Sequence, residues 1–270
     1  MIARRDLIQV GILGYGAIGS HVATAIVAGE AGKTAVSAIL CRDLSKYPEP
    51  LPQLTNDPDT FFATSSDLVV EAAGQEALRT YGRRVLENGS DLLVTSIGAF
   101  TDDDFWLELV ECAEKNGRRL LLASGALPAV DWMSAAALSG VKHVTITQTK
   151  PVASWRQTRA TEFVDLDVLT EPTRFFHGTA RQAASIFSKS SNITAMLALA
   201  TAGLDATTVA LFADPTSGQM RTQIEFESNV GSLRAEWHGI PSKNPSTSAG
   251  VPLSVVKALR NLTGTVAYGV

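Results

Sequence analysis

Residues 8–19 read IQVGILGYGAIG, an apolar run that leads directly into a glycine-rich turn. The run Ile8–Leu13 is typical of a buried strand, and residues 18–28 follow with the apolar spacing of a helix. A second apolar run, at residues 35–41, supplies the next strand. This strand–turn–helix–strand order predicts a βαβ unit, in which the two strands belong to one parallel sheet.

The turn carries the pattern Gly14-x-Gly16-x-x-Gly19. Gly14 permits the tight turn, Gly16 lets the backbone approach a pyrophosphate, and Gly19 lets the helix pack closely on the strand. The unpaired N–H groups at the start of a helix favour the phosphate charge. The pattern therefore predicts a dinucleotide-binding loop, and a glycine turn without a ligand is the alternative. The expected cofactor contacts are Gly14, Gly16, Ala17, Ile18 and Gly19.

The rest of the chain divides into two parts. Up to about residue 125 we expect further strands at 67–72, 92–96 and 120–123, with helices at 77–88 and 102–116. Beyond it, alternating β-branched segments at 144–148, 222–227 and 232–237 predict antiparallel strands, with helices at 180–187 and 193–202. The predicted fold is α/β: a Rossmann-type parallel sheet in residues 1–125, a second α+β domain with a mainly antiparallel sheet in 126–248, and a C-terminal helix in 249–270 that returns to the first domain.

The composition excludes several classes of protein. The 270 residues hold 23 Lys+Arg against 27 Asp+Glu, so no basic excess is available to neutralise a nucleic-acid backbone. No apolar stretch approaches the roughly 20 residues that a membrane span needs, and no His, Cys, Asp or Glu cluster has the spacing of metal ligands. The two cysteines, Cys41 and Cys112, cannot build a disulfide framework. We expect a cytoplasmic protein with a small-molecule substrate, without nucleic acid, membrane or metal.

The end of the second strand bears on the choice of cofactor. An acid there would bind the ribose 2′-hydroxyl of NAD, but the sequence reads Leu40-Cys41-Arg42-Asp43, with no acid at the last strand position. Arg42 can bind a 2′-phosphate through two hydrogen bonds. NADP is therefore favoured, while Asp43 keeps NAD open and a solvated loop residue is the alternative interpretation of Arg42.

Short motifs are spread over nearly the whole chain: 14–19 (GYGAIG), 71–74 (EAAG), 96–99 (SIGA), 124–126 (SGA), 150–151 (KP), 178–181 (GTAR), 192–193 (NI) and 244–248 (NPSTS). In this order they resemble the L-aspartate dehydrogenase family. The resemblance implies a Rossmann domain followed by a substrate and dimerisation domain, paired as a homodimer. It also implies interconversion of L-aspartate with oxaloacetate and ammonia through iminosuccinate, using NAD or NADP. In some organisms of that family the imine feeds NAD biosynthesis.

Two of these motifs extend the expected cofactor site. Ala73 and Gly74 follow one parallel strand, and Ser96, Gly98 and Ala99 follow the next. Ligands of such sheets bind at the carboxyl ends of the strands. Small residues there let a nicotinamide ring lie flat, so we expect these five residues to bind the cofactor.

Other motifs supply candidates for the substrate. Ser124, Gly125 and Ala126 join the two domains and can present backbone N–H groups to a substrate carboxylate. The polar candidates of the second domain are Lys150, Asn192, Asn244, Thr247 and Ser248. The alternatives are an exposed strand-end lysine at position 150 and, at 244–248, a turn that caps the last helix.

One departure from the family pattern concerns catalysis. The family carries a catalytic histidine in an Asn-x-His-Glu-Ile setting, and the matching stretch here reads Met220-Arg221-Thr222-Gln223-Ile224. Thr222 stands at the position of the histidine, and a threonine hydroxyl does not act as a general base near neutral pH without further activation. Among the histidines of the chain, His238 ends a strand just before the 244–248 motif, and it is the one candidate replacement. A solvated strand-end histidine is the alternative interpretation.

Three functions remain open from the sequence. The first is an NAD(P)-dependent oxidoreductase of a small dicarboxylic amino or imino acid, similar to L-aspartate dehydrogenase. The second is an NADPH-dependent reductase of another imine or ketone, which needs a proton donor rather than a base that activates water. The third is a nucleotide-binding sensor or partner protein without catalysis.

Overall fold

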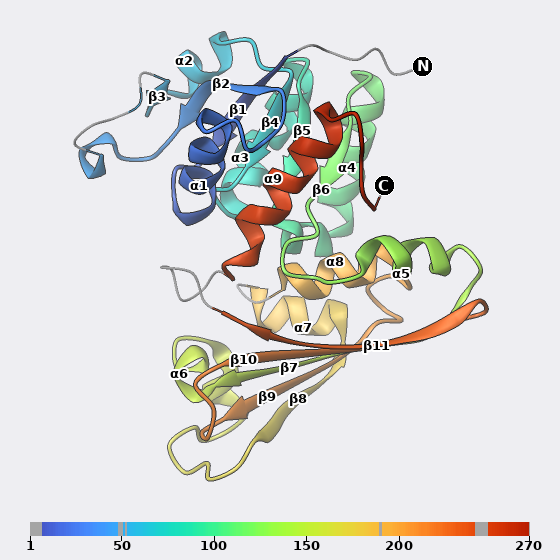
Figure 1. The fold of residues 1–270 in the computed structure, drawn as a ribbon. Coiled ribbons are helices and arrows are strands. Elements are labelled where there is room, and N and C mark those ends of the chain that lie inside the picture. Colours follow the sequence, from blue (N-terminus) through green and yellow to red (C-terminus); the bar gives the residue numbers. More distant parts are fainter. Residues whose placement is uncertain (1–6, 48–50, 52, 189–190, 241–247, 270) are drawn as a thin grey trace. The chain divides into compact units, whose positions relative to one another are not determined.

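The computed structural model describes residues 7–47, 51, 53–188, 191–240 and 248–269. The chain forms two compact units, Met1–Gly125 with Gly250–Val270, and Ala126–Ala249 (Figure 1). The first holds a parallel sheet and the second a mixed, mostly antiparallel sheet, which confirms the predicted α/β fold class.

The sheet of the first unit has the strand order β3-β2-β1-β4-β5-β6, and every pair in it is parallel. Because β1 lies between β2 and β4, the chain order reverses at β1, and ligands of doubly wound sheets bind at such a switch point. The strands are β1 (Ile8–Leu13), β2 (Thr34–Leu40), β3 (Leu54–Thr55), β4 (Leu68–Glu71), β5 (Asp91–Val94) and β6 (Leu120–Leu122).

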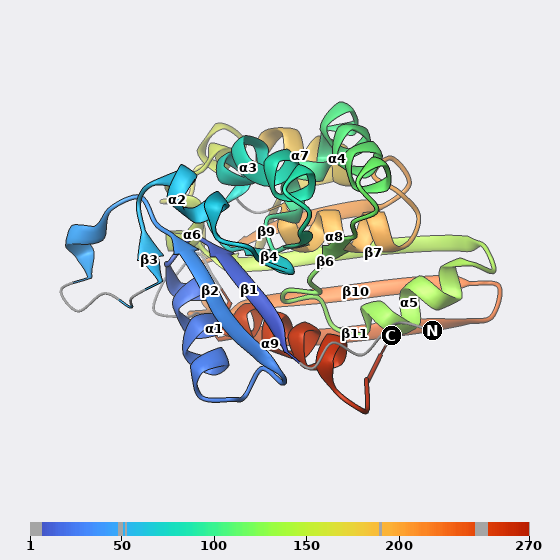
Figure 2. The same cartoon turned by 90° about the horizontal axis from the view of Figure 1, so that it is seen from above.

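Helices complete the first unit: α1 (Ala17–Val27), α2 (Pro58–Ala63), α3 (Gln75–Glu87), α4 (Asp103–Lys115) and α9 (Gly250–Thr263), with short 3₁₀ helices η1 (Leu44–Lys46) and η2 (Ile97–Thr101). The last helix, α9, lies beside α1 (Figures 1 and 2). Its apolar side chains Val255 and Leu259 are buried in the same core as Val22 and Ile26 of α1. The C-terminal helix is therefore part of the core that supports the glycine turn.

The second unit has a five-stranded sheet in the order β11-β10-β7-β9-β8. Its strands are β7 (Val141–Pro151), β8 (Thr173–Thr179), β9 (Thr208–Asp214), β10 (Met220–Ser228) and β11 (Gly231–Gly239). The pair β7 and β9 is parallel, and the other pairs are antiparallel. The sequence did not reveal β8 and β9. In β9 the run TVALFAD has almost no polar alternation, because residues on both of its faces are buried.

Helices α5 (Val130–Ala137), α7 (Ala180–Ile186) and α8 (Asn192–Ala200) lie over one face of this sheet (Figure 1). A short helix, α6 (Val152–Trp155), follows β7 directly, and a 3₁₀ helix, η3 (Arg159–Glu162), comes after it. In β10 the residues on the covered face are buried and those between them are more exposed, as the two-residue period of a strand requires. This alternation decides which polar side chains of the sheet share a face.

Candidate active site

The glycine turn connects β1 to α1 at the switch point of the first sheet. Gly14 has a φ of +97°, and a Cβ added there would lie 2.6 Å from the carbonyl oxygen of Ala72, in the loop after β4. A Cβ at Gly19 would collide with the carbonyl oxygen of Gly14. Both glycines are therefore required by the close approach of neighbouring backbone, at a turn that no larger residue fits.

Gly16 differs from its two neighbours in the motif. It is the N-cap of α1, it is exposed, and a Cβ added there would meet no atom within 4 Å. Within the described chain no side chain caps this helix, and its first turn contains no acidic residue. The N-terminus of α1, with Ala17 and Ile18, therefore presents backbone N–H groups to open space and fits a phosphate group.

The loop after β2 contacts the glycine turn. The hydroxyl of Tyr47 donates a hydrogen bond to the carbonyl oxygen of Tyr15 at 2.6 Å, and the two rings pack edge to face. The carboxylate of Asp43 accepts from the Ser45 backbone N–H at 3.0 Å and from its hydroxyl at 2.6 Å, which lowers the Asp43 pKa. Arg42 is exposed beside this turn. Asp43 is thus engaged as the cap of η1, whereas the arginine faces solvent at the end of β2.

A buried acid organises the two loops that follow β4 and β5. Glu71, the last residue of β4, has no exposed surface. Its carboxylate accepts from the backbone N–H groups of Ala73 at 2.9 Å and Gly74 at 2.8 Å. It also accepts from Ser96, through the backbone N–H at 3.0 Å and the hydroxyl at 2.9 Å, and from the Thr95 N–H at 3.3 Å. Burial raises the pKa of Glu71, and these hydrogen bonds oppose that effect.

This arrangement separates the expected nicotinamide contacts into two groups. Ala73 and Gly74 are exposed, next to the glycine turn, so their backbone can face a ligand. Ser96, Gly98 and Ala99 are buried, and the hydroxyl of Ser96 is bound to Glu71. The sequence did not identify Glu71 as a site residue. The signal in the sequence was an acid at the end of the otherwise apolar run LVVE, residues 68–71.

Residues 124–126 lie at the boundary between the units. Gly125 has a φ of +61°, and its N–H donates to the hydroxyl of Ser254 in α9 at 3.1 Å. That N–H, expected to bind a substrate carboxylate, is thus already bonded. Ser124 and Ala126 are half-buried.

In the second unit, polar side chains gather on the helix-covered face of the sheet. The amide nitrogen of Gln148, in β7, donates to the hydroxyl of Thr194, in α8, at 2.9 Å. Thr222 of β10 is paired in register with Gln148. All three are buried: Gln148 is 3% exposed, Thr194 2% and Thr222 8%. Gln148 and Thr194 are members of this polar cluster that the sequence did not indicate.

Lys150 extends the same cluster. It lies two residues after Gln148 in β7, and therefore on the same face of the strand. Its ammonium nitrogen is 4.7 Å from the centroid of the Trp155 ring, a cation–π distance. Burial lowers the pKa of Lys150 to about 8. Asn192 is the exposed first residue of α8, two residues before Thr194. Lys150 is thus half-buried, not the exposed strand-end lysine that was the alternative interpretation.

The structure does not bring His238 to this cluster. His238 is paired with Arg221, whereas Thr222 is paired with Trp237, so the two side chains lie on opposite faces of the sheet. The imidazole of His238 is 58% exposed, and its Nε2 lies 3.0 Å from a carboxylate oxygen of Glu236. Successive residues of a strand point to opposite faces of the sheet, so a shift of one residue in the pairing would move His238 to the other face. The sequence alone does not determine this register.

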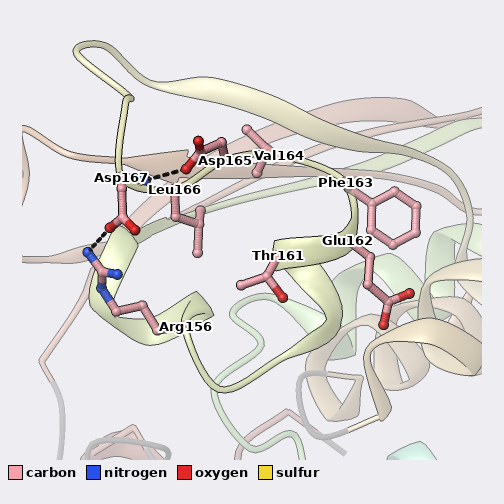
Figure 3. Close-up of a pocket in the computed structure, with 8 residues that line it drawn as sticks. All are labelled: Arg156, Thr161, Glu162, Phe163, Val164, Asp165, Leu166 and Asp167. Carbon is pink, nitrogen blue, oxygen red and sulfur yellow. Dashed lines mark hydrogen bonds and ion pairs between the residues drawn. The ribbon is translucent and has the colours of Figure 1, made fainter.

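Of the 244–248 motif, Asn244 and Thr247 lie outside the described residues. Ser248 is half-buried just before α9. A surface pocket of about 490 Å³ lies elsewhere, lined by Arg156 and residues 161–167 (Figure 3). Arg156 forms an ion pair with Asp167 at 2.7 Å across it, and none of the expected site residues lines it.

The described residues form neither a metal-binding cluster nor a membrane-spanning helix. They contain no group of three or more His, Cys, Asp or Glu side chains arranged to hold a metal ion. In the same ranges, every helix is too short or too polar to span a bilayer.

The first unit has the features of a dinucleotide-binding domain: the switch point of a parallel sheet, an exposed Gly16 and an uncapped helix. It is joined in the chain to a second, α+β unit. Family models match both parts: "Homoserine dehydrogenase, NAD binding domain" over residues 14–123 and "Aspartate dehydrogenase, C-terminal" over residues 131–262. The L-aspartate dehydrogenase of Ruegeria pomeroyi is 37% identical, covering 94% of this chain and 92% of its own. The one of Brucella anthropi is 34% identical, covering 94% and 96%. The chain belongs to the L-aspartate dehydrogenase family, whose members are NAD(P)-dependent oxidoreductases.

Solved structures agree with this fold. The aspartate dehydrogenase of Thermotoga maritima superposes with a TM-score of 0.74 at 22% identity, covering 97% of this chain and 99% of the other. A hyperthermophilic archaeal homoserine dehydrogenase in complex with NADPH gives a TM-score of 0.59 at 12% identity, covering 93% and 95%.

Proposed function

We propose that this protein oxidises L-aspartate with NAD(P)⁺ to iminosuccinate, which is then hydrolysed to oxaloacetate and ammonia, and that it catalyses the reverse reaction. The observation that carries the proposal is the similarity to L-aspartate dehydrogenases over both units of the chain. The exposed glycine turn supports a dinucleotide there. When bound, the nicotinamide supplies the hydride chemistry. The protein supplies binding, orientation and proton transfer.

For the cofactor we propose contacts from the glycine turn and from the loops held by Glu71. The glycine turn binds the pyrophosphate through Gly14, Gly16, Ala17, Ile18 and Gly19. The nicotinamide is bound by the exposed Ala73 and Gly74. The buried residues behind them, Ser96, Gly98 and Ala99, set the shape of the nicotinamide site. NADP is the preferred form in this proposal, because Arg42 is exposed at the end of β2 while the neighbouring Asp43 is engaged by Ser45. Neither Arg42 nor Asp43 therefore offers an unengaged carboxylate to a ribose 2′-hydroxyl.

For the substrate we propose the polar cluster of the second unit. A dicarboxylate needs hydrogen-bond donors and positive charge, and Lys150 with Asn192 and Ser248 supplies both within the described residues. Ser124 and Ala126, and the expected Asn244 and Thr247, complete the set. Gly125 contributes through the shape of its turn, since its N–H is bonded to Ser254. We further propose a homodimer in the cytoplasm, in accord with the family, whose imine product is a precursor for NAD biosynthesis.

The test is a steady-state assay of L-aspartate oxidation, followed by the absorbance of the reduced nicotinamide, with NAD⁺ and NADP⁺ in turn. Matched controls are D-aspartate, which differs only in configuration, and L-glutamate, which is one methylene longer. We expect turnover with L-aspartate and a kcat/KM at least tenfold lower with either control. Equal rates with all three amino acids, or no rate with any of them, would contradict the proposal.

One observation favours a second candidate, the reductase of a preformed imine. Thr222 stands where the family has its catalytic histidine, and hydride transfer to a ready-made imine does not require a base that activates water. This candidate predicts consumption of NADPH with oxaloacetate and ammonia but no aspartate oxidation. A protein that binds NADPH and turns over neither would be the sensor or partner protein.

A further inference from the structure

We infer that Tyr47 is a positioning residue for the choice of cofactor: it holds the loop that carries Arg42 on the glycine turn, so that the guanidinium is in place before NADP binds. The inference rests on the proposed binding of NADP at that turn. It adds a residue that acts through Arg42 rather than by touching the cofactor. All residues involved belong to the first unit.

The loop that carries Arg42 is anchored to the glycine turn at two points. Before Arg42, the N–H of Gly14 donates to the carbonyl oxygen of Leu40, the last residue of β2, at 2.8 Å. After Arg42, the hydroxyl of Tyr47 donates to the carbonyl oxygen of Tyr15 at 2.6 Å. Gly14 and Tyr15 are consecutive residues of the turn, so both anchors end at the same place. Arg42 therefore lies in a loop whose two ends are fixed to the proposed pyrophosphate site.

The second anchor depends on the hydroxyl of Tyr47. Between the described residues, the other hydrogen bonds of 43–47 are local: Asp43 accepts from Ser45, and the N–H of Tyr47 donates to the carbonyl oxygen of Leu44 at 3.0 Å. These bonds shape η1, but they do not attach it to the glycine turn. Loss of the hydroxyl should therefore release the end of the loop without breaking its internal structure.

The two tyrosine rings support this hydrogen bond. Tyr47 and Tyr15 pack edge to face with ring centroids 4.9 Å apart, and both residues are half-buried. Burial raises the pKa of Tyr47, so its hydroxyl keeps the proton that it donates at neutral pH and above. The contact can thus hold the loop in one position while Arg42 stays exposed to a ligand.

A loop that is held in advance favours the phosphorylated cofactor. A guanidinium that is already in place loses less conformational freedom when it binds a 2′-phosphate. The affinity for NADPH is then proportional to the fraction of the protein whose loop is in position. NADH has no 2′-phosphate and gains nothing from Arg42. Tyr47 should therefore change the ratio of the two affinities.

The decisive variant is Tyr47→Phe, which removes the hydroxyl and keeps the ring. Fluorescence titration should show a loss of about threefold to tenfold in affinity for NADPH, the range of one hydrogen bond, and a change of less than about twofold for NADH. In the aspartate assay, KM for NADP⁺ should rise by the same factor at an unchanged kcat. The matched control is Tyr81→Phe, at a half-buried tyrosine of α3 whose ring packs on Phe62, and it should change neither affinity.

Two further measurements isolate the role of the loop. In a double-mutant cycle, Tyr47→Phe in the Arg42→Ala background should lower the affinity for NADPH by less than about twofold, because the group that the loop positions is gone. Without cofactor, the amides of residues 43–47 should exchange with deuterium faster in Tyr47→Phe than in the wild type. Thermal unfolding checks that each variant is folded. Tyr47→Leu, which also removes the ring, is a second variant and should weaken NADPH at least as much.

The outcomes separate the inference from the proposed function. A loss of NADPH affinity in Arg42→Ala but in neither variant of Tyr47 overturns the inference alone. An equal loss for NADPH and NADH also overturns it, because Tyr47 would then support the glycine turn and not Arg42. A full further loss in the double variant has the same meaning. A wild type that does not bind NADPH, or an Arg42→Ala variant that binds it normally, overturns the proposed cofactor preference and the inference with it.

Discussion

Glu71 accepts two hydrogen bonds from Ser96, one from the backbone N–H at 3.0 Å and one from the hydroxyl at 2.9 Å. Glu71 ends β4 and Ser96 lies two residues after the end of the neighbouring parallel strand β5. The same carboxylate also binds the N–H groups of Ala73 and Gly74. A single buried acid therefore fixes two loops at the carboxyl edge of the sheet, where ligands of this fold bind. The shape of the cofactor site depends on a residue that is itself withdrawn from solvent.

Replacing Glu71 should therefore weaken both the fold and cofactor binding. Glu71→Ala leaves several buried donors without an acceptor, each costing about 1–3 kcal/mol, and we expect unfolding to require at least about 3 kcal/mol less. NADPH affinity should fall at least tenfold. The matched control is Glu111→Gln, an exposed acid on α4, which should change stability by less than about 0.5 kcal/mol. Denaturant unfolding with NADPH titration measures both, and an alanine variant with native affinity would separate Glu71 from the site.

Arg42→Ala should discriminate between the two cofactors. Losing one charge-assisted contact to a 2′-phosphate costs on the order of 1.5–3 kcal/mol, whereas NADH has no such phosphate. Fluorescence titration should show a loss of roughly tenfold or more in affinity for NADPH and little change for NADH. Arg174→Ala, an exposed arginine on β8 of the second unit, is the control. Equal weakening of both cofactors by Arg42→Ala would refute the assignment.

Thr222→His should raise the rate of aspartate oxidation. The wild type has a neutral hydroxyl where the family has its catalytic histidine, so its kcat should be low, and an imidazole at this position adds a base. We expect a gain of tenfold or more, about 1.4 kcal/mol of barrier. Thr222→Leu adds bulk without a base and should give no gain. Because Met220 also departs from the family pattern, Met220→Asn is to be combined with Thr222→His, and no gain in either form would remove position 222 from the reaction.

The pH dependence of stability tests the environment of Lys150 separately from catalysis. Its pKa is lowered from 10.5 to about 8 in the folded state, so below pH 8 the folded protein holds a disfavoured charge that the unfolded chain hydrates freely. This difference corresponds to at most about 3 kcal/mol. Wild-type stability relative to Lys150→Met should therefore be lowest below pH 8 and rise between pH 8 and 10.5. Chemical denaturation across this range measures it, and a difference that does not change with pH would show that the lysine is not desolvated.

Local patterns in the sequence predicted most of the first unit and its glycine turn, but not β3 or α2. Strand and helix periods decide which segments form, and the glycine spacing decides where the turn lies. β9 was missed because its residues are buried on both faces, which removes the alternation that marks a strand. β8 has an irregular register with β9 between Arg174 and Phe176, which blurs its period.

The candidate site was harder to predict because its key contacts join distant segments. Glu71 and Ser96 are 25 positions apart, and Gln148 and Thr194 are 46 apart, so no local pattern reports either contact. The face on which His238 lies depends on the pairing of Thr222 with Trp237, which a shift of one residue would reverse. The sequence shows the residue types, but only the fold determines the face of the sheet on which each residue lies and the residue that it contacts.

Gly16→Val tests whether the glycine turn binds the cofactor of this oxidoreductase. A Cβ at Gly16 meets no protein atom within 4 Å, so the valine should leave the fold intact and occupy the space of the pyrophosphate. Gly218→Val, at another glycine with open space around its Cβ, is the matched control. In a calorimetric titration with NADPH, we predict native affinity for the wild type and Gly218→Val and at least a tenfold loss for a folded Gly16→Val. Unchanged affinity in Gly16→Val would contradict the account, because the cofactor would then bind elsewhere.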